Sequence, residues 1–562
     1  MFCNLSCRVA LAFFLIVTLA AGPSTLAQEP PADLPPITIR TNSRLVMVDV
    51  VVTDKKGDPV TGLKAEDFTA EENGKKQKIS VFVPPGAANK TAPTPPPPGV
   101  LSNHPENVSP AGVPTVLLLD ANSQFKDQAY ARSQMLKYVL EQGQSGRPMA
   151  VITLTDRLRV LQQFTSDPQI LIAAIKSLRP EQPILQPGAP SPVSAAVGGG
   201  SSGRGEGPGG NVATMIANAR AEVDSFANLQ VGYLLERRTV ITIEAMRNLA
   251  RMLGGLPGRK NVVWLTADFP FDLHPEDRNM SDEELLGDLP SIRQKSVSTI
   301  AAGSLASQQR EMHGQEIRDA EWQLASAGVA IYPVDIRGIM TTGIDVANTG
   351  TMQEIASETG GKAYTNQNDI KLGIALAASD EKASYSIGYY PDNKKWDGKY
   401  RTIKVKVAQG DTQVRHRKGY YAVDPTIAKG HNSEQDVSAA LDVNAPATQI
   451  SFMAQSKPTD PGKMRVIFLV DAHTLTAEDS GGSKKMNVTM YASVYDQNGK
   501  NLGTRTTKVD RAFDAATYQQ ILAKGMLVPI DMDIPAGGKE LRLAVLDNKT
   551  GLIGTVAGPI GQ

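Results

Sequence analysis

The sequence is poor in cysteine and histidine and has no excess charge of either sign. Its 562 residues include 2 cysteines and 6 histidines, and the cysteines, Cys3 and Cys7, lie at the extreme N-terminus. This scarcity argues against a disulfide scaffold, a cysteine-ligated zinc site and a cysteine nucleophile. Lys and Arg total 58, and so do Asp and Glu, which gives a formal net charge of zero. That balance argues against a nucleic-acid-binding protein that depends on bulk positive charge.

Long apolar runs are also scarce, because the one strong run lies at the start of the chain. It extends from Val9 to Ala20 behind the single charge of Arg8, and it is shorter than the roughly 20 residues that span a bilayer. The triplet Thr25–Ala27 has small residues at its first and third positions, which is typical of a signal-peptidase site. We therefore predict a signal peptide over residues 1–27, cleaved after Ala27, and a secreted or periplasmic protein with no integral membrane span in the mature chain. An uncleaved N-terminal anchor is the alternative interpretation.

The chain does contain enough apolar residues to build several domains. Hydrophobic residues make up 41% and charged residues 21%, a balance typical of folded proteins, and the length indicates more than one domain. Residues 37–83 alternate apolar and polar positions and include the hairpin turn Glu72–Lys75, so we predict a β-rich N-terminal module. Residues 84–110 contain the run Pro95–Pro98 and are predicted to be a Pro-rich linker.

The middle of the chain, residues 111–425, alternates strand patterns with helix patterns. Near-continuous apolar runs predict strands at Thr115–Asp120, Ala150–Leu154, Asn261–Thr266 and Val329–Val334. The intervening helices indicate a doubly wound, mostly parallel sheet that is covered on both faces. A Gly-rich insertion at about 180–211 matches dinucleotide-loop and nucleophile-elbow patterns only formally, because no strand leads into it. We therefore predict a flexible linker there.

The last part of the chain returns to β structure. The pattern over about residues 383–422 predicts antiparallel strands that extend the edge of the α/β domain. Residues 426–446 are predicted to be a second linker, and residues 447–562 a C-terminal β-sandwich, because strand runs there alternate with turn residues. The predicted fold class is α/β, a doubly wound domain flanked by N-terminal and C-terminal β-sandwich-like modules.

Short segments spread between Gly62 and Tyr421 carry a family resemblance. They are Gly62–Phe68, Val116–Asp120, Gln128–Arg132, Asp156–Arg159, Phe164–Pro168, Gly258–Trp264, Tyr332–Gly338, Glu358–Gly361 and Lys418–Tyr421. As a set they resemble the von Willebrand factor A family, and within it the secreted bacterial VWFA-related Acidobacterial domain proteins. The resemblance covers about residues 37–425. It implies a von Willebrand A-like fold and a protein or peptide ligand.

The same resemblance implies a divalent-metal site. Family members that bind a ligand through a metal carry Asp-x-Ser-x-Ser after the first strand, and a Thr and an Asp from two further loops complete their site. Here Asp120 matches, Asn122 and Gln124 replace the two serines, and no second-loop Thr corresponds. Asp268 lies slightly beyond the expected third-loop position. Such oxygen ligands suit Mg²⁺ or another divalent cation, and the predicted ligands are Asp120, Asn122, Gln124 and Asp268.

The alternative to a working metal site is a retained fold with a degraded site, in which Asp120 only ends its strand. For the whole protein, the leading hypothesis is a secreted, non-enzymatic interaction or adhesion protein, whose partner adds an acidic ligand to any bound metal. A second hypothesis is an exported hydrolase whose catalytic Asp and Glu residues are dispersed in the sequence. A third is a structural component of the cell envelope. No catalytic residue is predicted.

Overall fold

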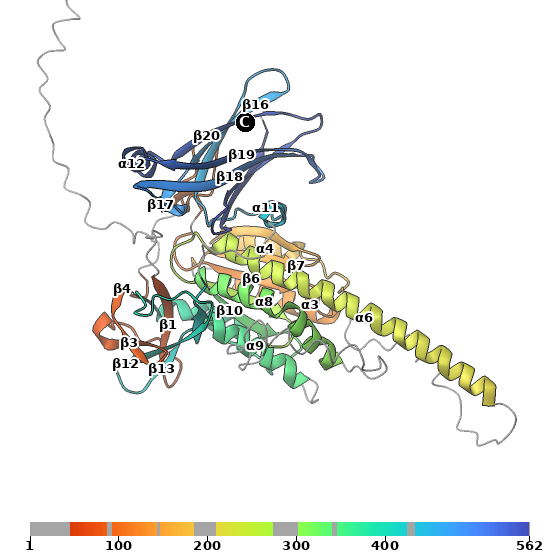
Figure 1. Cartoon of the computed structure of the whole chain (residues 1–562). Coiled ribbons are helices and arrows are strands. Elements are labelled where there is room, and N and C mark those ends of the chain that lie inside the picture. The colour runs from red at the N-terminus through yellow and green to blue at the C-terminus, as the bar shows by residue number, and fades with distance from the viewer. Residues whose placement is uncertain are drawn as a thin grey trace, which may run out of the picture. The chain divides into compact units, whose positions relative to one another are not determined.

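The computed structural model describes residues 45–86, 93–108, 110–142, 146–184, 210–273, 302–339, 345–423 and 433–560 (Figure 1). The chain separates into two compact units, Met1–Thr38 and Ile39–Gln562, and every described residue belongs to the second. The predicted signal peptide and most of the Gly-rich insertion therefore lie outside the described residues. Among the described residues, no helix is both long and apolar enough to cross a membrane.

The central sheet of the α/β domain has five strands in the order β10-β9-β6-β7-β8. They are β6 (Thr115–Asp120), β7 (Met149–Leu154), β8 (Leu158–Thr165), β9 (Lys260–Thr266) and β10 (Val329–Asp335). All pairs are parallel except β7 with β8, so the sheet is mixed, with one antiparallel edge strand that the sequence analysis did not predict. Strand order reverses between β6 and β9, which makes the fold doubly wound and places a topological switch point there.

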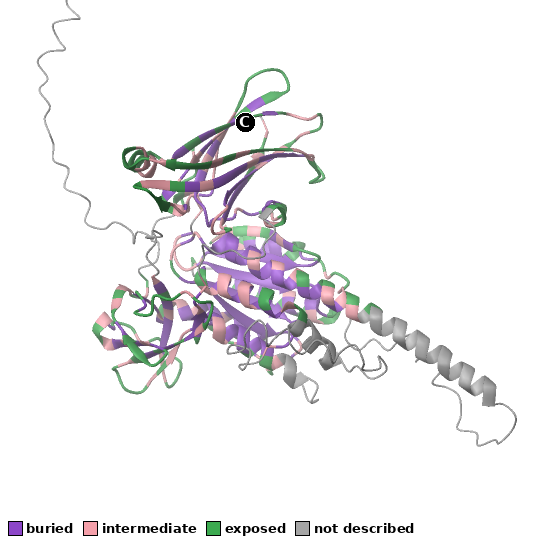
Figure 2. Ribbon diagram, viewed as in Figure 1, coloured by how far each residue is buried: buried purple, intermediate pink, exposed green. Residues whose placement is uncertain are grey.

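Helices cover both faces of this sheet because successive residues of β6 point to opposite sides. Leu117 and Leu119 join one core cluster, whereas Val116 and Leu118 join the other. The first cluster is covered by α3 (Phe125–Gln142), α4 (Pro168–Ser177) and α10 (Ile370–Ser379), and the second by α6 (Gly210–Leu253), α8 (Ala302–Ser326) and α9 (Asp345–Thr359). Figure 2 shows the buried residues concentrated in these strands and on the inner sides of the helices.

The strands that follow the α/β domain do not extend its sheet, which corrects the prediction for residues 383–422. They pair instead with the N-terminal strands to form two four-stranded sheets, β13-β1-β11-β4 and β14-β12-β2-β3. The strands are β1 (Val46–Asp54), β2 (Phe68–Glu72), β3 (Lys75–Gln77), β4 (Ile79–Val83), β11 (Ser384–Tyr389), β12 (Tyr400–Val407), β13 (Thr412–Arg415) and β14 (Gly419–Tyr421). We call this the split β module.

The split β module is discontinuous because neither half can bury its apolar face alone. Val48 and Val50 of β1 share one buried cluster with Tyr385 and Ile387 of β11. A few short strands without such a partner would leave this surface in water. The predicted boundary at residue 83 therefore cuts through a folded unit.

The C-terminal region contains two sheets that share one core cluster. Their strands are β15 (Phe452–Pro458), β16 (Lys463–Val470), β17 (Glu478–Ser480), β18 (Ser483–Tyr495), β19 (Asn501–Phe513), β20 (Met526–Asp533), β21 (Glu540–Asp547) and β22 (Ile553–Pro559), with α12 (Ala515–Lys524) between β19 and β20. Alternate burial along β20 shows the expected pattern of one apolar face and one polar face. The β-sandwich arrangement of these sheets stays a prediction.

Both predicted linkers contain ordered elements. Within residues 84–110, β5 (Val100–Ser102) pairs with β15, and α2 (Pro105–Val108) follows it. The Asn103 side chain fastens this segment by donating to the carbonyls of Ala447 and Ile450. Within residues 426–446, α11 (Ser433–Asp442) buries Val437, Ala440 and Leu441. Short 3-10 helices occur at Ala65–Asp67, Asp380–Ala383 and Ala472–Thr474.

Candidate functional site

The candidate site lies at the carboxyl-terminal edge of the central sheet, where the strand order reverses. β6 ends at Asp120 and its neighbour β9 ends at Thr266, two residues before Asp268. Loops that follow the strands of a doubly wound sheet converge at this edge, which is where such folds bind ligands. The structure thus brings together two of the predicted site residues, Asp120 and Asp268, although they are far apart in sequence.

Asp120 is buried and held by hydrogen bonds on both carboxylate oxygens. Its Oδ1 accepts from the backbone N–H of Asn122 at 2.9 Å, and its Oδ2 lies 2.8 Å from the hydroxyl of Thr266. Burial raises the pKa of Asp120 above its ordinary value, while Arg238, the Asn122 amide and the Thr266 hydroxyl all act in the opposite direction. The carboxylate is therefore fixed in position and partly compensated in charge.

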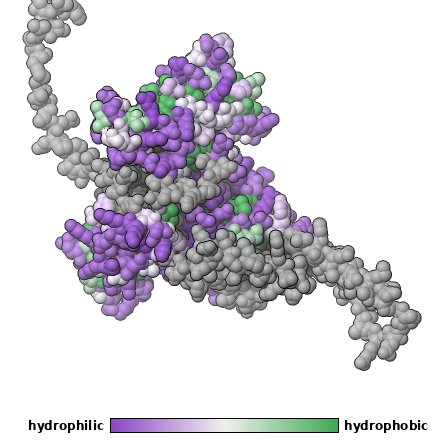
Figure 3. Space-filling view, viewed as in Figure 1, coloured by the Kyte–Doolittle hydropathy of each residue, from purple (hydrophilic) through white to green (hydrophobic). Residues whose placement is uncertain are grey.

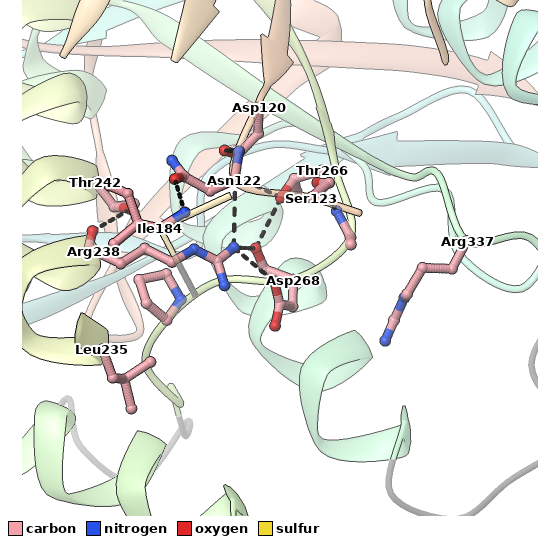
Figure 4. A network of polar contacts seen from close by, with 12 residues as sticks. Asp120, Asn122, Ser123, Ile184, Leu235, Arg238, Thr242, Thr266, Asp268 and Arg337 are labelled. Atoms are coloured by element: carbon pink, nitrogen blue, oxygen red, sulfur yellow. Dashed lines mark hydrogen bonds and ion pairs between the residues drawn. The ribbon is translucent and has the colours of Figure 1, made fainter. Parts of the chain in front are cut away.

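The compensating charge comes from Arg238, a residue of α6 that is 1% exposed. Its Nη2 lies 2.6 Å from Asp268 Oδ1, 2.9 Å from the Asp268 carbonyl oxygen and 3.7 Å from Asp120 Oδ2. Figure 4 shows the side chain reaching from the helix toward Asp268 and the end of β6. Burial works against the charged guanidinium, but Asp268 and Asp120 outweigh it and raise the pKa of Arg238. The carboxylates of Asp120 and Asp268 thus share the buried guanidinium of Arg238.

Arg238 was missed by the sequence analysis, although a signal for it exists. It stands on a helical stripe with Leu235, Thr242, Ala245 and Leu249, all of which are buried. The spacing of three and four residues marks one face of a helix. An arginine on such a face must find a buried acidic partner, because an unpaired charge in the core is very unfavourable.

Neither of the other two predicted ligands contacts Asp120 or Asp268 through its side chain in the described structure. The Asn122 side chain donates to the carbonyl of Thr155 at 3.1 Å, and its Oδ1 lies 3.4 Å from the N–H of Ile184. Gln124 is exposed, and its backbone carbonyl accepts from the N–H groups of the first turn of α3. The Asn122 side chain therefore links neighbouring loops, and Gln124 lies just before the first residue of α3.

The loop after β6 is held in place by two residues that the sequence analysis did not assign to the site. Ser123 Oγ accepts from the backbone N–H of Ala267 at 3.1 Å, which links the loops that follow β6 and β9. Gln128 is 1% exposed, and its Nε2 lies 2.7 Å from the carbonyls of both Ala121 and Ser123. Both contacts hold the backbone around Asp120 in place.

The residues present do not fit a divalent cation between Asp120 and Asp268. Mg²⁺ needs close oxygen ligands at about 2.0 to 2.1 Å, and the space between these two side chains is taken by the Arg238 nitrogen. A metal ion there would stand against a guanidinium of the same charge sign. Elsewhere among the described residues, no group of three or more His, Cys, Asp or Glu side chains is arranged to hold a metal.

A second arginine–carboxylate pair lies at the end of the next strand. Asp335 closes β10, and Arg337 donates from Nε to its Oδ1 at 3.0 Å and from Nη2 to its Oδ2 at 2.8 Å. Asp335 is fully buried, whereas the Arg337 side chain is 13% exposed. The buried carboxylates that end β6 and β10 are therefore each accompanied by an arginine.

Exposed apolar side chains lie at the same edge of the sheet as these buried carboxylate–arginine pairs. Phe125 at the start of α3 is 58% exposed, and Ile339 in the loop after β10 is 57% exposed. Tyr130 of α3 donates its hydroxyl to the Asn368 carbonyl at 2.9 Å, and Asn368 Oδ1 accepts from the Ile339 N–H at 3.0 Å. Asn368 thus connects α3 to the β10 loop. We call Gln124, Phe125, Tyr130 and Ile339 the strand-end surface.

No family model matches the sequence, and no curated protein matches it closely enough to count as a relative. Similar solved structures include a von Willebrand factor type A protein from Catenulispora acidiphila, 9% identical over 89% of this chain and 74% of that one, with a TM-score of 0.21. They also include the vWF domain of the pilus tip protein Mfa5 from Porphyromonas gingivalis, 11% identical over 48% of this chain and 94% of that one, at 0.26. BatB from Bacteroides thetaiotaomicron is 14% identical over 48% and 98%, at 0.21. The doubly wound fold of the α/β domain is shown by its own strand order, β10-β9-β6-β7-β8.

Proposed function

We propose that the protein is exported and that its α/β domain binds a protein or peptide ligand at the strand-end surface, without acting as an enzyme. The observation that carries this proposal is the pair of exposed apolar side chains, Phe125 at the start of α3 and Ile339 in the loop after β10. Exposed aromatic and aliphatic groups over a fixed backbone lose little conformational entropy on binding. The ligand contacts would be mainly apolar, because the carboxylates below are buried and paired.

Position, and not patch size, distinguishes this surface. Figure 3 shows a face on which the described residues are mostly hydrophilic and hydrophobic groups are scattered, and isolated exposed apolar residues are ordinary. Phe125 and Ile339 differ because they stand on the edge where a doubly wound sheet presents its loops. Ser123, Gln128 and Asn368 hold these loops by the hydrogen bonds described above, which supports a preformed binding surface.

The geometry also favours binding over hydrolysis. A hydrolase with dispersed acidic residues needs carboxylates that can exchange protons with a substrate at the surface. Asp120 and Asp335, the acidic residues that end β6 and β10, are buried. Each also lies beside an arginine, Arg238 and Arg337 respectively. The proposed role therefore uses their charge balance to hold the loops and does not use them as acid or base.

The ligand surface can be tested by selecting a displayed random-peptide library against the full mature chain. We expect enriched peptides to lose at least about tenfold in affinity for the double variant Phe125→Ser/Ile339→Ser, since one apolar anchor contributes about 2 kcal/mol or more. The matched control is Leu527→Ser, which removes a side chain that is 65% exposed on β20. Peptides that do not distinguish the double variant from the control would contradict the proposed surface.

Export rests on the predicted signal peptide and has a separate test. Expression of the full sequence in a bacterium with a Sec pathway should yield a mature protein that begins at Gln28, because the Thr25–Ala27 triplet has the small residues of a cleavage site. Intact-mass measurement of the extracellular and periplasmic fractions checks this. A cytoplasmic product that retains Met1 or an uncleaved membrane-bound chain would contradict cleavage after Ala27.

A further inference from the structure

We infer that Arg238 is a built-in cation that takes the place of a divalent metal at the strand-end site, and that its removal would unmask a cation site made of this chain's own oxygens. The inference does not depend on the identity of any ligand. It concerns the α/β domain alone and rests on how the oxygens of two loops are arranged around one nitrogen.

The oxygens of Asp120, Thr266 and Asp268 converge on a single point. Arg238 Nη2 lies within 3.7 Å of Asp120 Oδ2, Asp268 Oδ1 and the Asp268 carbonyl oxygen. The Thr266 hydroxyl lies 2.8 Å from both Asp120 Oδ2 and the Asp268 carbonyl, so it belongs to the same group. Carboxylate, carbonyl and hydroxyl oxygens are the ligands that hard divalent cations take. The nitrogen therefore stands where such an ion would be held.

Another buried arginine of the same helix contacts its carboxylates differently. Arg251 also has two carboxylate partners, but its Nη1 contacts Glu244 at 2.6 Å and its Nη2 contacts Asp436 at 2.6 Å. Its two partners therefore reach different nitrogens and do not converge. Asn248 Oδ1 also lies 2.9 Å from Nη1, but each Arg251 nitrogen meets only one of the two carboxylates. Arg238 Nη2, by contrast, faces both Asp120 and Asp268.

The hydrogen bonding of Arg238 is incomplete. Its buried Nε has no hydrogen-bond partner among the described residues. An unpaired buried donor is unfavourable, so the side chain is held here by its charge and not by complete hydrogen bonding. Other arginines share this property of Nε, among them Arg247 of the same helix, so the special position of Arg238 rests on its Nη2 contacts with Asp120 and Asp268.

The test compares the thermal unfolding midpoint of full-length variants in EDTA and in millimolar Mn²⁺. We expect the wild-type midpoint to change by less than about 1 °C, and the Arg238→Met midpoint to rise by at least about 3 °C with Mn²⁺, since a ligand that binds only the folded state stabilises it. Adding Asp268→Asn to Arg238→Met should abolish the rise because it removes one ligand and one negative charge. The matched control, Arg251→Met, should lose stability without gaining any response to Mn²⁺.

Folding failure is itself informative in this design. If Arg238→Met folds only when Mn²⁺ is present, the inference is supported. If it folds in neither solution, or folds and shows no rise, the unmasked site is refuted. Electron paramagnetic resonance of Mn²⁺ with the wild-type protein gives an independent measurement. One tightly bound Mn²⁺ that Asp120→Asn removes would overturn the inference, because Arg238 would then not be excluding the ion.

Discussion

The two edges of the central sheet use buried arginines in different ways. At the carboxyl-terminal edge, Asp120 and Asp268 converge on one nitrogen of Arg238. At the opposite edge, just before β9, Arg259 donates to three unlike acceptors: Asn261 Oδ1, the Tyr332 hydroxyl and the Gly360 carbonyl. The first arrangement concentrates negative charge around one cation, whereas the second spreads an arginine over neutral groups.

The second edge also joins two modules. The Tyr332 hydroxyl donates to Asp380 Oδ2 at 2.6 Å, and Arg415 of the split β module pairs with the same carboxylate. Lys418 lies 3.3 Å from Glu354 of α9, and the Tyr400 hydroxyl donates to Glu358 at 2.8 Å. The ion pair between Arg415 and Asp380 therefore links the split β module to the α/β domain. At the carboxyl-terminal edge, by contrast, Arg238 balances the charge of two carboxylates within the α/β domain.

Among substitutions at the two edges, we expect that of Arg238 to lower stability most. Arg238→Met should lower the free energy of unfolding by about 3 to 5 kcal/mol, because it leaves two neighbouring carboxylates without their counter-charge. Adding Asp268→Asn should restore part of that loss. Urea unfolding of the two single variants and the double variant gives the coupling energy. Additive losses, with no coupling between Arg238 and Asp268, would contradict the shared-cation arrangement.

A smaller loss in the free energy of unfolding is expected at the opposite edge, where Arg415 pairs with Asp380. Arg415→Met should cost about 1 to 2 kcal/mol, because Asp380 keeps the Tyr332 hydroxyl and the Arg415 side chain is 29% exposed. Addition of Tyr332→Phe should raise the loss sharply, since the carboxylate would then lose both partners. The same urea measurement checks this. A loss at Arg415 equal to that at Arg238 would remove the distinction between the two edges.

The smallest effect is a pH dependence confined to the split β module. Burial lowers the pKa of His416, whose Nε2 accepts from the Val405 N–H at 3.0 Å and whose Nδ1 lies 2.7 Å from the Arg417 carbonyl. A second ring proton would break the bond from Val405. The stability that His416 contributes is therefore complete above its ordinary pKa near 6.5 and is lost as the pH falls through the lower folded value.

The expected slope for this loss is at most about 1.4 kcal/mol per pH unit. Urea midpoints measured from neutral pH downward check it, and His416→Gln should flatten the curve in that window. Among the described residues no histidine is hydrogen-bonded to Asp120, Arg238 or Asp268, so Arg238→Met should leave the His416 component unchanged. An unaltered slope in His416→Gln would contradict this assignment.

The sequence predicted those features that are written locally. The apolar run that ends in Asp120 identified both a buried strand and its acidic end, and the run Asn261–Thr266 identified β9, which ends two residues before Asp268. Both residues reach one edge because parallel strands end together. Arg238 could not be assigned to this edge, since a helical pattern shows that a residue is buried but not which loop it meets.

The split β module escaped prediction for a related reason. Alternation along β1 and β11 indicates strands, but it does not say which strand is the partner, and pairing with the nearest domain was the simpler interpretation. The observed register joins Val50 to Tyr385 and Val48 to Ile387. Only burial of a common apolar face decides between the two pairings, and burial depends on the whole fold.

The split β module has a consequence for the order in which the chain can fold. Among the described strands, β1 and β4 pair only with strands of the second half, and the bond from the Leu63 N–H to the Tyr385 hydroxyl spans 322 positions. During synthesis the first half therefore has unpaired strand edges until the whole α/β domain has been made. Once β11 pairs with β1, the two ends of the α/β domain are clamped together. The split β module can therefore be completed only after the α/β domain inserted within it has been fully synthesised.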